Sequence, residues 1–246
     1  MKKQIIAIGG AALPIGVDNL LLVDYFLRQT GKRKPKVCFI GTAHGDADAG
    51  RLRFYAGFGQ FNCKPTHLPL FARTPRDLAS FVLEQDAIFV GGGNTRSMLA
   101  VWRDWGVPQV LRNAAARGTV LAGVSAGAIC WFEWGASDSA SPGTRSGPLR
   151  CLGFLKGSCS PHWGGEVHRR RDFHAMIRRG DVPAGYGISD GAALLFENSR
   201  LVEAVSTDPA AGAFRVERTG DRLCETPLPT RALASLKPPA PRRATR

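Results

Sequence analysis

The clearest indication of chemistry is the G-x-S-x-G pattern of residues 123–127, which has Ser125 at its centre. The pattern follows an apolar run and precedes several small residues, which is the strand–turn–helix context that this motif requires. Glycines on both sides of Ser125 allow a tight turn that raises its hydroxyl above the sheet. The following helix would then direct its free amides at a developing oxyanion. A plain turn with a serine helix cap is the alternative.

A second glycine-rich turn, residues 91–94, follows another apolar run. Because glycines expose their backbone amides, Gly92 and Gly93 could complete an oxyanion hole together with the amide of Ala126. The alternative interpretation is an ordinary turn in which Asn94 or Thr95 caps a helix.

A nucleophilic serine needs a general base, and the chain contains five histidines. His162 lies in a loop bracketed by proline and glycine, where catalytic side chains are commonly displayed. His168 and His174 fall in or beside an arginine-rich helix, where a solvated position is expected. His44 follows the second predicted strand and could border the same site. His162 is therefore the preferred base.

The base needs an orienting carboxylate, and two positions compete for this role. Asp138 would give the chain order serine, acid, histidine of the α/β-hydrolases, whereas Asp190 would give the order serine, histidine, acid. The pair Asp190-Gly191 is also a hairpin signal, so Asp190 has a structural explanation without catalysis. The spacing leaves both residues open.

Short apolar runs alternate with helical patterns through the first half of the chain, which predicts βαβ units. The runs are continuous, as is typical of a parallel sheet with helices on both faces, and the ligand site of such a sheet lies beyond the carboxyl ends of its strands. Gly9-Gly10 does not complete G-x-G-x-x-G, so a dinucleotide site is not supported. The predicted strands are 4–8, 36–40, 66–70, 87–90 and 119–124, and the predicted helices are 17–29, 47–57, one opened by Thr74-Pro75, one from 95, and 107–117.

The second half of the chain changes character. Beyond a helix at 172–179, short strands joined by turns are expected at 185–189, 192–196, 201–206 and 213–217. We expect a single α/β domain over residues 1–226, in which these short C-terminal antiparallel strands complete the fold.

The net charge of +13 could indicate a polyanionic partner, but five of the positive charges lie in the last sixteen residues, which contain no acid. Residues 227–246 are rich in Pro, Ala and Arg and are predicted to be a disordered basic tail. Since no aromatic residue is interleaved with these charges, nucleic-acid binding is not expected.

The sequence favours a cytoplasmic protein with free cysteines. No apolar run approaches the roughly 20 residues of a membrane span, and the amino-terminal segment lacks a signal-peptide pattern. The six cysteines have no C-x-x-C pair and no zinc-type spacing, which predicts free, mostly buried thiols.

Several of these segments occur together in one known family. The stretch 122–171, with its G-x-S-x-G and Pro161-His162, resembles the peptidase E group of serine peptidases, relatives of cyanophycinase, and the segments 91–95 and 188–191 are similar to family segments as well. The resemblance implies a flavodoxin-like or class I glutamine-amidotransferase-like sheet. It also implies a dipeptidase that releases N-terminal aspartate from Asp-X dipeptides without metal or cofactor.

The resemblance also implies roles for individual residues. Ser125 would be the nucleophile and His162 the general base, with the amides named above as oxyanion donors. For the third member it favours Asp190, at a position where this superfamily often has glutamate, and Asp138 is the alternative acid.

Selection of an acidic side chain requires a cationic pocket, and the run Arg169-Arg170-Arg171 follows the histidine loop. Three consecutive arginines cannot all face one pocket from a helix, so Arg170 and Arg171 are the predicted pair. Glu166 is the predicted partner of the substrate amine, and Asn94 is predicted to line the same site.

Two rival functions remain open. One is a cyanophycinase-like peptidase or an esterase that uses the same triad, and the other is a non-catalytic binding protein on the same scaffold, held to a polyanion by the basic tail. The expected partner is a small peptide substrate rather than a membrane or nucleic acid, and a homodimer is left open.

Overall fold

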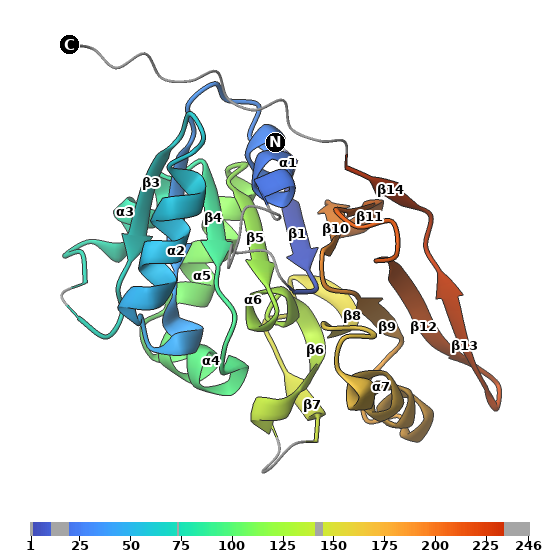
Figure 1. The fold of residues 1–246 in the computed structure, drawn as a ribbon. Helices are drawn as coiled ribbons and strands as arrows, with labels where there is room; N and C mark the ends of the chain where they lie inside the picture. The colour runs from blue at the N-terminus through green and yellow to red at the C-terminus, as the bar shows by residue number, and fades with distance from the viewer. Residues whose placement is uncertain (1, 11–19, 73, 141–144, 234–246) are drawn as a thin grey trace.

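A computed structural model of the chain describes residues 2–10, 20–72, 74–140 and 145–233, and these residues form two sheets with helices packed against them (Figure 1). The strands of the first sheet are β1 (Gln4–Ile8), β2 (Lys36–Ile40), β3 (Lys64–Leu68), β4 (Ala87–Val90), β5 (Val120–Val124), β10 (Ala192–Glu197), β11 (Arg200–Ser206) and β14 (Thr230–Ala232). Their order in the sheet is β14-β11-β10-β1-β5-β4-β2-β3.

The five neighbouring strands β1, β5, β4, β2 and β3 of the first sheet are all parallel. The strands on the other side of β1, which are β10, β11 and β14, pair in both senses. Parallel pairing joins β1 to β5, β5 to β4, β4 to β2, and β2 to β3. On its other side β1 pairs with β10 in the antiparallel sense, and β10 pairs with β11 in the same way. The carboxyl ends of the central parallel strands therefore meet at one edge of the sheet, where a site is expected.

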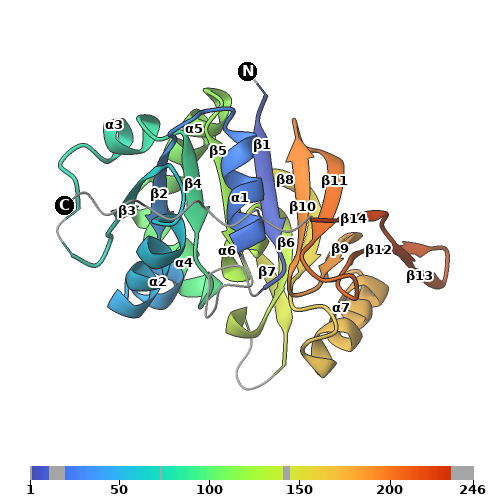
Figure 2. The same ribbon diagram turned by 45° about the horizontal axis from the view of Figure 1, so that its top comes forward.

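Helices cover both faces of this sheet, as the views in Figures 1 and 2 show. In β1, Ile5 and Ala7 belong to one buried cluster and Ile6 and Ile8 to another, because successive side chains of a strand point to opposite faces. The cluster with Ile6 and Ile8 contains side chains of α1 (Leu20–Gln29) and α2 (Asp48–Phe58). The cluster with Ile5 and Ala7 contains side chains of α3 (Leu78–Leu83), α4 (Thr95–Asp104) and α5 (Val107–Ala116).

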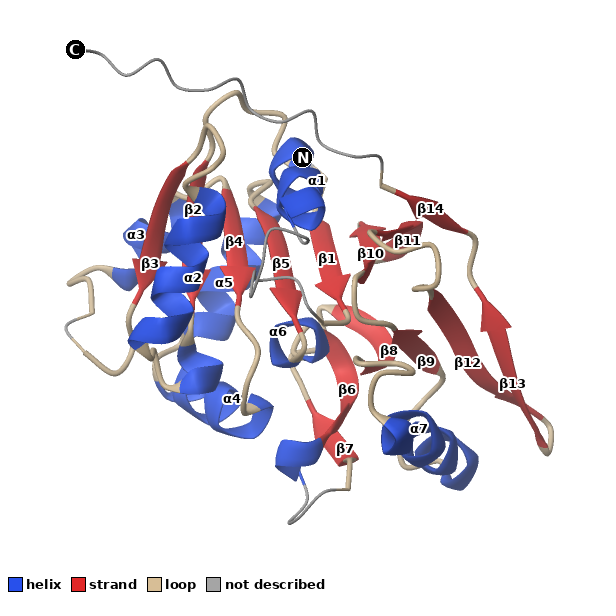
Figure 3. Cartoon of the chain, in the orientation of Figure 1, coloured by secondary structure: helices blue, strands red, loops and turns tan. Residues whose placement is uncertain are grey.

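The second sheet lies beside the first and has α7 (Val167–Arg179) packed against it (Figure 3). Its strands are β6 (Phe132–Ser137), β7 (Gly147–Arg150), β8 (Leu155–Ser160), β9 (Gly185–Ile188), β12 (Ala213–Thr219) and β13 (Arg222–Pro227), in the order β13-β12-β9-β8-β6-β7. Phe173 and Met176 of α7 pack with Trp163 and Val216 on one face. On the other face Phe132 and Leu155 join a cluster shared with the first sheet.

Three short helices complete the described fold. They are η2 (Thr42–His44) after β2, α6 (Ala126–Ile129) after β5, and η3 (Asp138–Ala140) after β6. Each begins directly behind a strand, so all three lie among the segments that can form a site.

The α/β class and the parallel sheet with two helical layers are confirmed, and several predicted boundaries are corrected. Strand β3 begins two residues earlier than predicted, because its register with β2 includes polar edge positions. Helix α3 begins at Leu78 and not at Thr74-Pro75, since the Asp77 side chain accepts from the Ser80 amide at 2.9 Å and caps the helix there. Residues 17–19 of the predicted first helix lie outside the described residues.

Other elements were not predicted or began elsewhere. The helix predicted at 172–179 begins at Val167, and β6, β7, β8 and β13 had no prediction. Strands β6 and β8 have glycine and charged residues between their apolar positions, so they lack the apolar run that identified the other strands. The predicted tail begins too early, because residues 230–232 form β14 and pair with β11. Residues 234–246 lie outside the described part of the chain.

Candidate active site

Ser125 lies on a sharp turn between β5 and α6, with φ 55° and ψ −113°. A residue with a side chain adopts this conformation only when its surroundings impose it. The Ser125 amide donates to the Ile8 carbonyl at 3.1 Å, and its carbonyl accepts from the amides of Ala128 and Ile129 at 2.9 Å. A Cβ on Gly123 would overlap the backbone of the following helix, so the turn requires glycine there.

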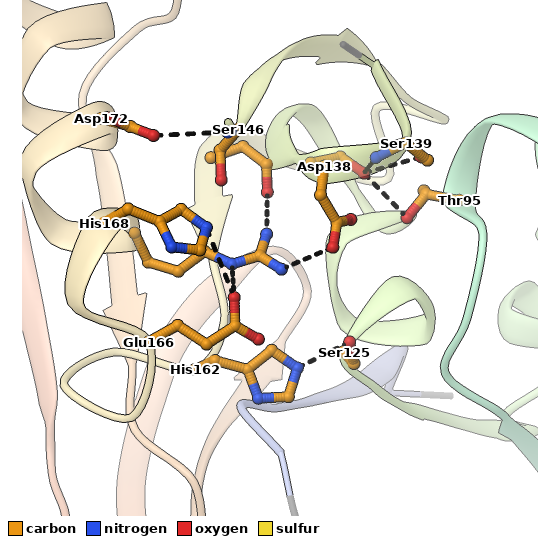
Figure 4. A network of polar contacts seen from close by, with 12 residues as sticks. Thr95, Ser125, Asp138, Ser139, Ser146, His162, Glu166, His168 and Asp172 are labelled. Atoms are coloured by element: carbon orange, nitrogen blue, oxygen red, sulfur yellow. Dashed lines mark hydrogen bonds and ion pairs between the residues drawn. The ribbon is translucent and has the colours of Figure 1, made fainter. Parts of the chain in front are cut away.

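His162 also has a positive φ, 56°, in the loop between β8 and α7. The neighbouring Trp163 amide donates to the Ile188 carbonyl at 3.0 Å, which ties the loop to β9. The Nε2 atom of His162 lies 2.9 Å from Ser125 Oγ, within hydrogen-bond distance (Figure 4). Two strained residues from distant parts of the chain are therefore held in direct contact.

Asp190 follows β9, and its Oδ1 lies 2.7 Å from the Nδ1 atom of His162. A backbone bridge to Gly10, in which the Gly191 amide donates to the Gly10 carbonyl at 3.1 Å, fixes this position. A Cβ on Gly10 would overlap the Asp190 carboxylate and lie 2.6 Å from His162 Nδ1. The absence of a side chain at Gly10 thus makes room for the contact.

The predicted oxyanion residues surround Ser125. A Cβ on Gly92 would lie 3.2 Å from Ser125 Cβ, and Gly93 has φ +131° at a place where a Cβ would overlap the carbonyl of Ala43. Among the hydrogen bonds of the described residues, none uses the amides of Gly92, Gly93 or Ala126. These three donors are therefore available to an oxygen atom near the serine.

A pocket of about 450 Å³ opens beside Ser125 and His162. Asn94 both lines this pocket and caps α4, since its Oδ1 accepts from the Ser97 amide at 2.8 Å. The lining comes from three loops, the short helices α6 and η3, and the helices α4 and α7: Gly93, Asn94, Thr95, Ser125, Ala126, Ile129, Asp138, Ser139, His162, Glu166 and Arg169.

The structure corrects the predicted pair of arginines. Arg170 bonds Glu225 at 2.8 Å and Arg171 pairs with Asp172 at 3.4 Å, both on the solvent side of α7 and outside the pocket. Arg169 is the arginine that lines the pocket. Its position on the helix is one turn before Phe173, on the face that α7 packs against the second sheet.

Asp138 and Glu166 both pair with Arg169. Arg169 donates from Nη2 to Asp138 Oδ2 at 3.1 Å and from Nε to Glu166 Oε2 at 2.6 Å. Partial burial raises the pKa of Glu166, but the hydrogen bond and charge of Arg169 outweigh this effect, and the pKa lies below its usual value. No hydrogen bond joins Asp138 to His162 within the described chain, so the alternative acid does not contact the predicted base.

Several residues of this site escaped prediction: Thr95, Ile129 and Ser139 of the pocket lining, and also Gly10 and Arg169. Gly10 was considered only as part of an incomplete dinucleotide motif, and no local pattern shows that it faces His162. Arg169 was set aside within the arginine run. Its spacing from Phe173 and Met176, at one and two helical turns, is the signal that could have placed it on the inward face.

The cysteines are all free, as predicted, and Cys159 near His162 is buried. Burial raises the pKa of the Cys159 thiol far above its usual range, which leaves it protonated and a poor nucleophile. Within the described residues, no group of three or more His, Cys, Asp or Glu side chains is arranged to hold a metal ion. The described helices also include none long and apolar enough to cross a membrane.

The fold and site together define an α/β protein with a hydrogen-bonded serine, histidine and aspartate beyond the carboxyl end of a central strand, an arrangement suited to acyl transfer. Residues 5–204 match the family model for Peptidase family S51, and the chain belongs to this family.

Known proteins agree with this assignment. The chain is 47% identical over 231 residues to "Uncharacterized peptidase YgaJ" of Bacillus subtilis, covering 94% of this chain and 99% of that protein. A putative peptidase E from Listeria monocytogenes matches with a TM-score of 0.64 and 17% identity, over 85% of this chain and 100% of that one. A peptidase from an acI-B1 Actinobacterium matches with a TM-score of 0.67 and 16% identity, over 92% and 95%. At these identities the two structures support the fold alone.

Proposed function

We propose that the protein is a serine-type peptidase of short peptides, with Ser125 as nucleophile, His162 as general base and Asp190 as the orienting acid. The observation that carries this proposal is the continuous contact from Ser125 Oγ through both ring nitrogens of His162 to Asp190, at 2.9 and 2.7 Å. The strained backbone of Ser125 and His162 supports it, because such strain is concentrated at functional sites.

In the proposed reaction, Ser125 Oγ attacks the scissile carbonyl while His162 Nε2 takes the hydroxyl proton. The free amides of Gly92, Gly93 and Ala126 would stabilise the oxyanion. His162 then gives its proton to the leaving amine, which departs and leaves an acyl ester on Ser125. Water, deprotonated by the same histidine, releases the acid and restores the serine.

An Asp-X dipeptide, expected from the family resemblance, is the second and finer candidate for the substrate. The presence of Arg169 in the pocket favours it, since a guanidinium can bind a carboxylate. The charges beside Arg169 oppose it, because Glu166 and Asp138 line the same pocket and already pair with this arginine.

Hydrolysis of a panel of X-Leu dipeptides separates these candidates. Asn-Leu and Asp-Leu form the matched pair, because their first side chains have nearly the same shape but differ in charge. We expect Asn-Leu to have the higher kcat/KM, by about tenfold, since like charges brought together cost energy. Hydrolysis is measured by release of free leucine, with short acyl esters and a β-linked Asp-Arg peptide in the same series.

Selective cleavage of Asp-Leu would instead establish an aspartyl dipeptidase. Cleavage of the β-linked peptide or the esters alone would favour the cyanophycinase-like or esterase alternative. A complete lack of turnover with every substrate would favour a binding protein on the same scaffold. The cytoplasmic location, the homodimer and the lack of nucleic-acid binding stay predictions.

A further inference from the structure

A second cavity, of about 310 Å³, lies along α7 and is separate from the pocket beside Ser125. Helix α7 lies on the outer side of the second sheet (Figure 1), and the two cavities have no lining residue in common. The proposed reaction uses none of the residues that line the second cavity, which are Arg170, Arg171, His174 and Arg178. This basic cavity therefore needs an explanation of its own.

The four lining residues form a stripe along one face of α7. Arg170, His174 and Arg178 follow one another at intervals of four residues, and Arg171 lies three residues before His174. Because a helix rises about 1.5 Å per residue, the stripe is about 12 Å long. Its end is anchored to β12, since the Arg178 carbonyl accepts from Arg218 Nη1 at 3.0 Å. A stripe of this length is longer than one phosphate group and matches a short chain of them.

The positive charges of the stripe face outward, and their carboxylate partners lie behind them. The side chains of Arg170 and Arg171 are 58% and 71% exposed, whereas those of their partners, Glu225 and Asp172, are 12% and 13% exposed. Arg178 is exposed as well, and among the described residues its guanidinium has no ion pair or hydrogen bond. Three guanidinium groups against two carboxylates leave an excess of positive charge at the surface, which an anion complements.

His174 lies one helical turn from an arginine on either side. Its Nε2 atom is 2.8 Å from Glu225 Oε2, the oxygen that also accepts from Arg170 Nε at 2.8 Å. Burial lowers the pKa of His174, and the charges of Arg170 and Arg178 act in the same direction, which together outweigh the opposite effect of Glu225. A bound anion would counter the arginine charges and favour the protonated ring, in which both nitrogens are donors.

We propose that this stripe is a binding site for a short polyphosphate chain, held by the guanidinium groups of Arg170, Arg171 and Arg178. A guanidinium suits phosphate because its fixed fork of donors contacts two oxygens at once. The length of the stripe favours a chain over a single phosphate. The described lining has no Phe, Tyr or Trp on which a base could stack, which favours a free chain over one carried by a nucleotide.

Isothermal titration calorimetry of the full chain with phosphate, pyrophosphate and triphosphate tests the site. We expect the affinity to rise about tenfold with each added phosphate group, because each group brings further hydrogen bonds to charged donors. The pKa of His174, measured by NMR, should rise when triphosphate is bound. ATP should bind as tightly as triphosphate, and tighter binding of ATP would support the site with a nucleotide as the source of the chain. Equal affinities for the three inorganic anions, or an unchanged pKa of His174, would overturn it.

Variants separate a site on α7 from binding that follows the net charge of +13. Arg171→Gln and Arg178→Gln should each weaken triphosphate binding about tenfold. Arg28→Gln is the matched control, because Arg28 is 73% exposed and pairs with Asp24 at 2.6 Å on α1, outside the cavity. Arg243→Gln, in the predicted tail, is the second control. Each control removes the same charge and should leave the affinity nearly unchanged. Equal losses in all four variants would overturn the proposal.

Discussion

Replacing Ser125 by alanine is expected to reduce kcat by about 10⁴- to 10⁶-fold, as when the nucleophile of another serine peptidase is removed. Ser125 Oγ is the atom that contacts His162 Nε2, and alanine at this position leaves the base with nothing to activate. Residual turnover would come from the oxyanion amides and from substrate binding alone. The loss should therefore appear in kcat and not in KM, which steady-state kinetics with the best X-Leu dipeptide can measure.

Ser97→Ala is the control for this substitution, because Ser97 is exposed on α4 and alanine is a good helix former. Its kcat should stay near that of the wild type. A Ser125→Ala variant that keeps its fold and retains near-normal turnover would remove this serine from the mechanism.

The second large effect is expected at Asp190, where Asp190→Asn should lower kcat by about 10⁴-fold. In the proposed mechanism the carboxylate, 2.7 Å from His162 Nδ1, holds the proton on that nitrogen and stabilises the imidazolium that forms, and an amide cannot supply that charge. Because asparagine has nearly the same shape, the fold should be retained, which circular dichroism and thermal unfolding can confirm.

Asp138→Asn is the comparison that decides between the two acids. Asp138 bonds Arg169 and not His162, so its substitution should leave kcat within about tenfold of the wild type and act mainly on KM. If Asp138→Asn lost the larger share of kcat and Asp190→Asn the smaller, the acid would be Asp138, in the chain order of the α/β-hydrolases.

The turn that carries Ser125, the proposed nucleophile, could be predicted from sequence because its signal is local. The turn at Ser125 needs an apolar strand, two glycines and a helix of small residues, and all of these lie within about ten positions of one another. The strands of the parallel sheet were predictable for a similar reason, since burial on both faces leaves a continuous apolar run.

The carboxylate that contacts His162 could not be chosen from sequence because its position depends on distant segments. Asp190 reaches His162 only because β9 carries it to the end of β1, where Gly10 has no side chain. Nothing in the local sequence around Asp190 distinguishes this arrangement from an ordinary hairpin turn.

The residues that line the pocket were predicted in part. Glu166 and Asn94 line the pocket as expected, but the arginines were assigned to the wrong helical face. Only β9 and β12 of the second sheet were predicted as strands, and this sheet is the surface against which α7 packs Phe173 and turns Arg169 inward.

The most direct test of the account is to treat the protein with a fluorophosphonate and to map the adduct by mass spectrometry. The account predicts a single adduct on Ser125, slowed by a short unblocked peptide and nearly abolished in His162→Ala, which lacks the general base. An adduct on another residue would contradict the account. So would an enzyme that hydrolyses peptides while excess reagent leaves Ser125 unmodified.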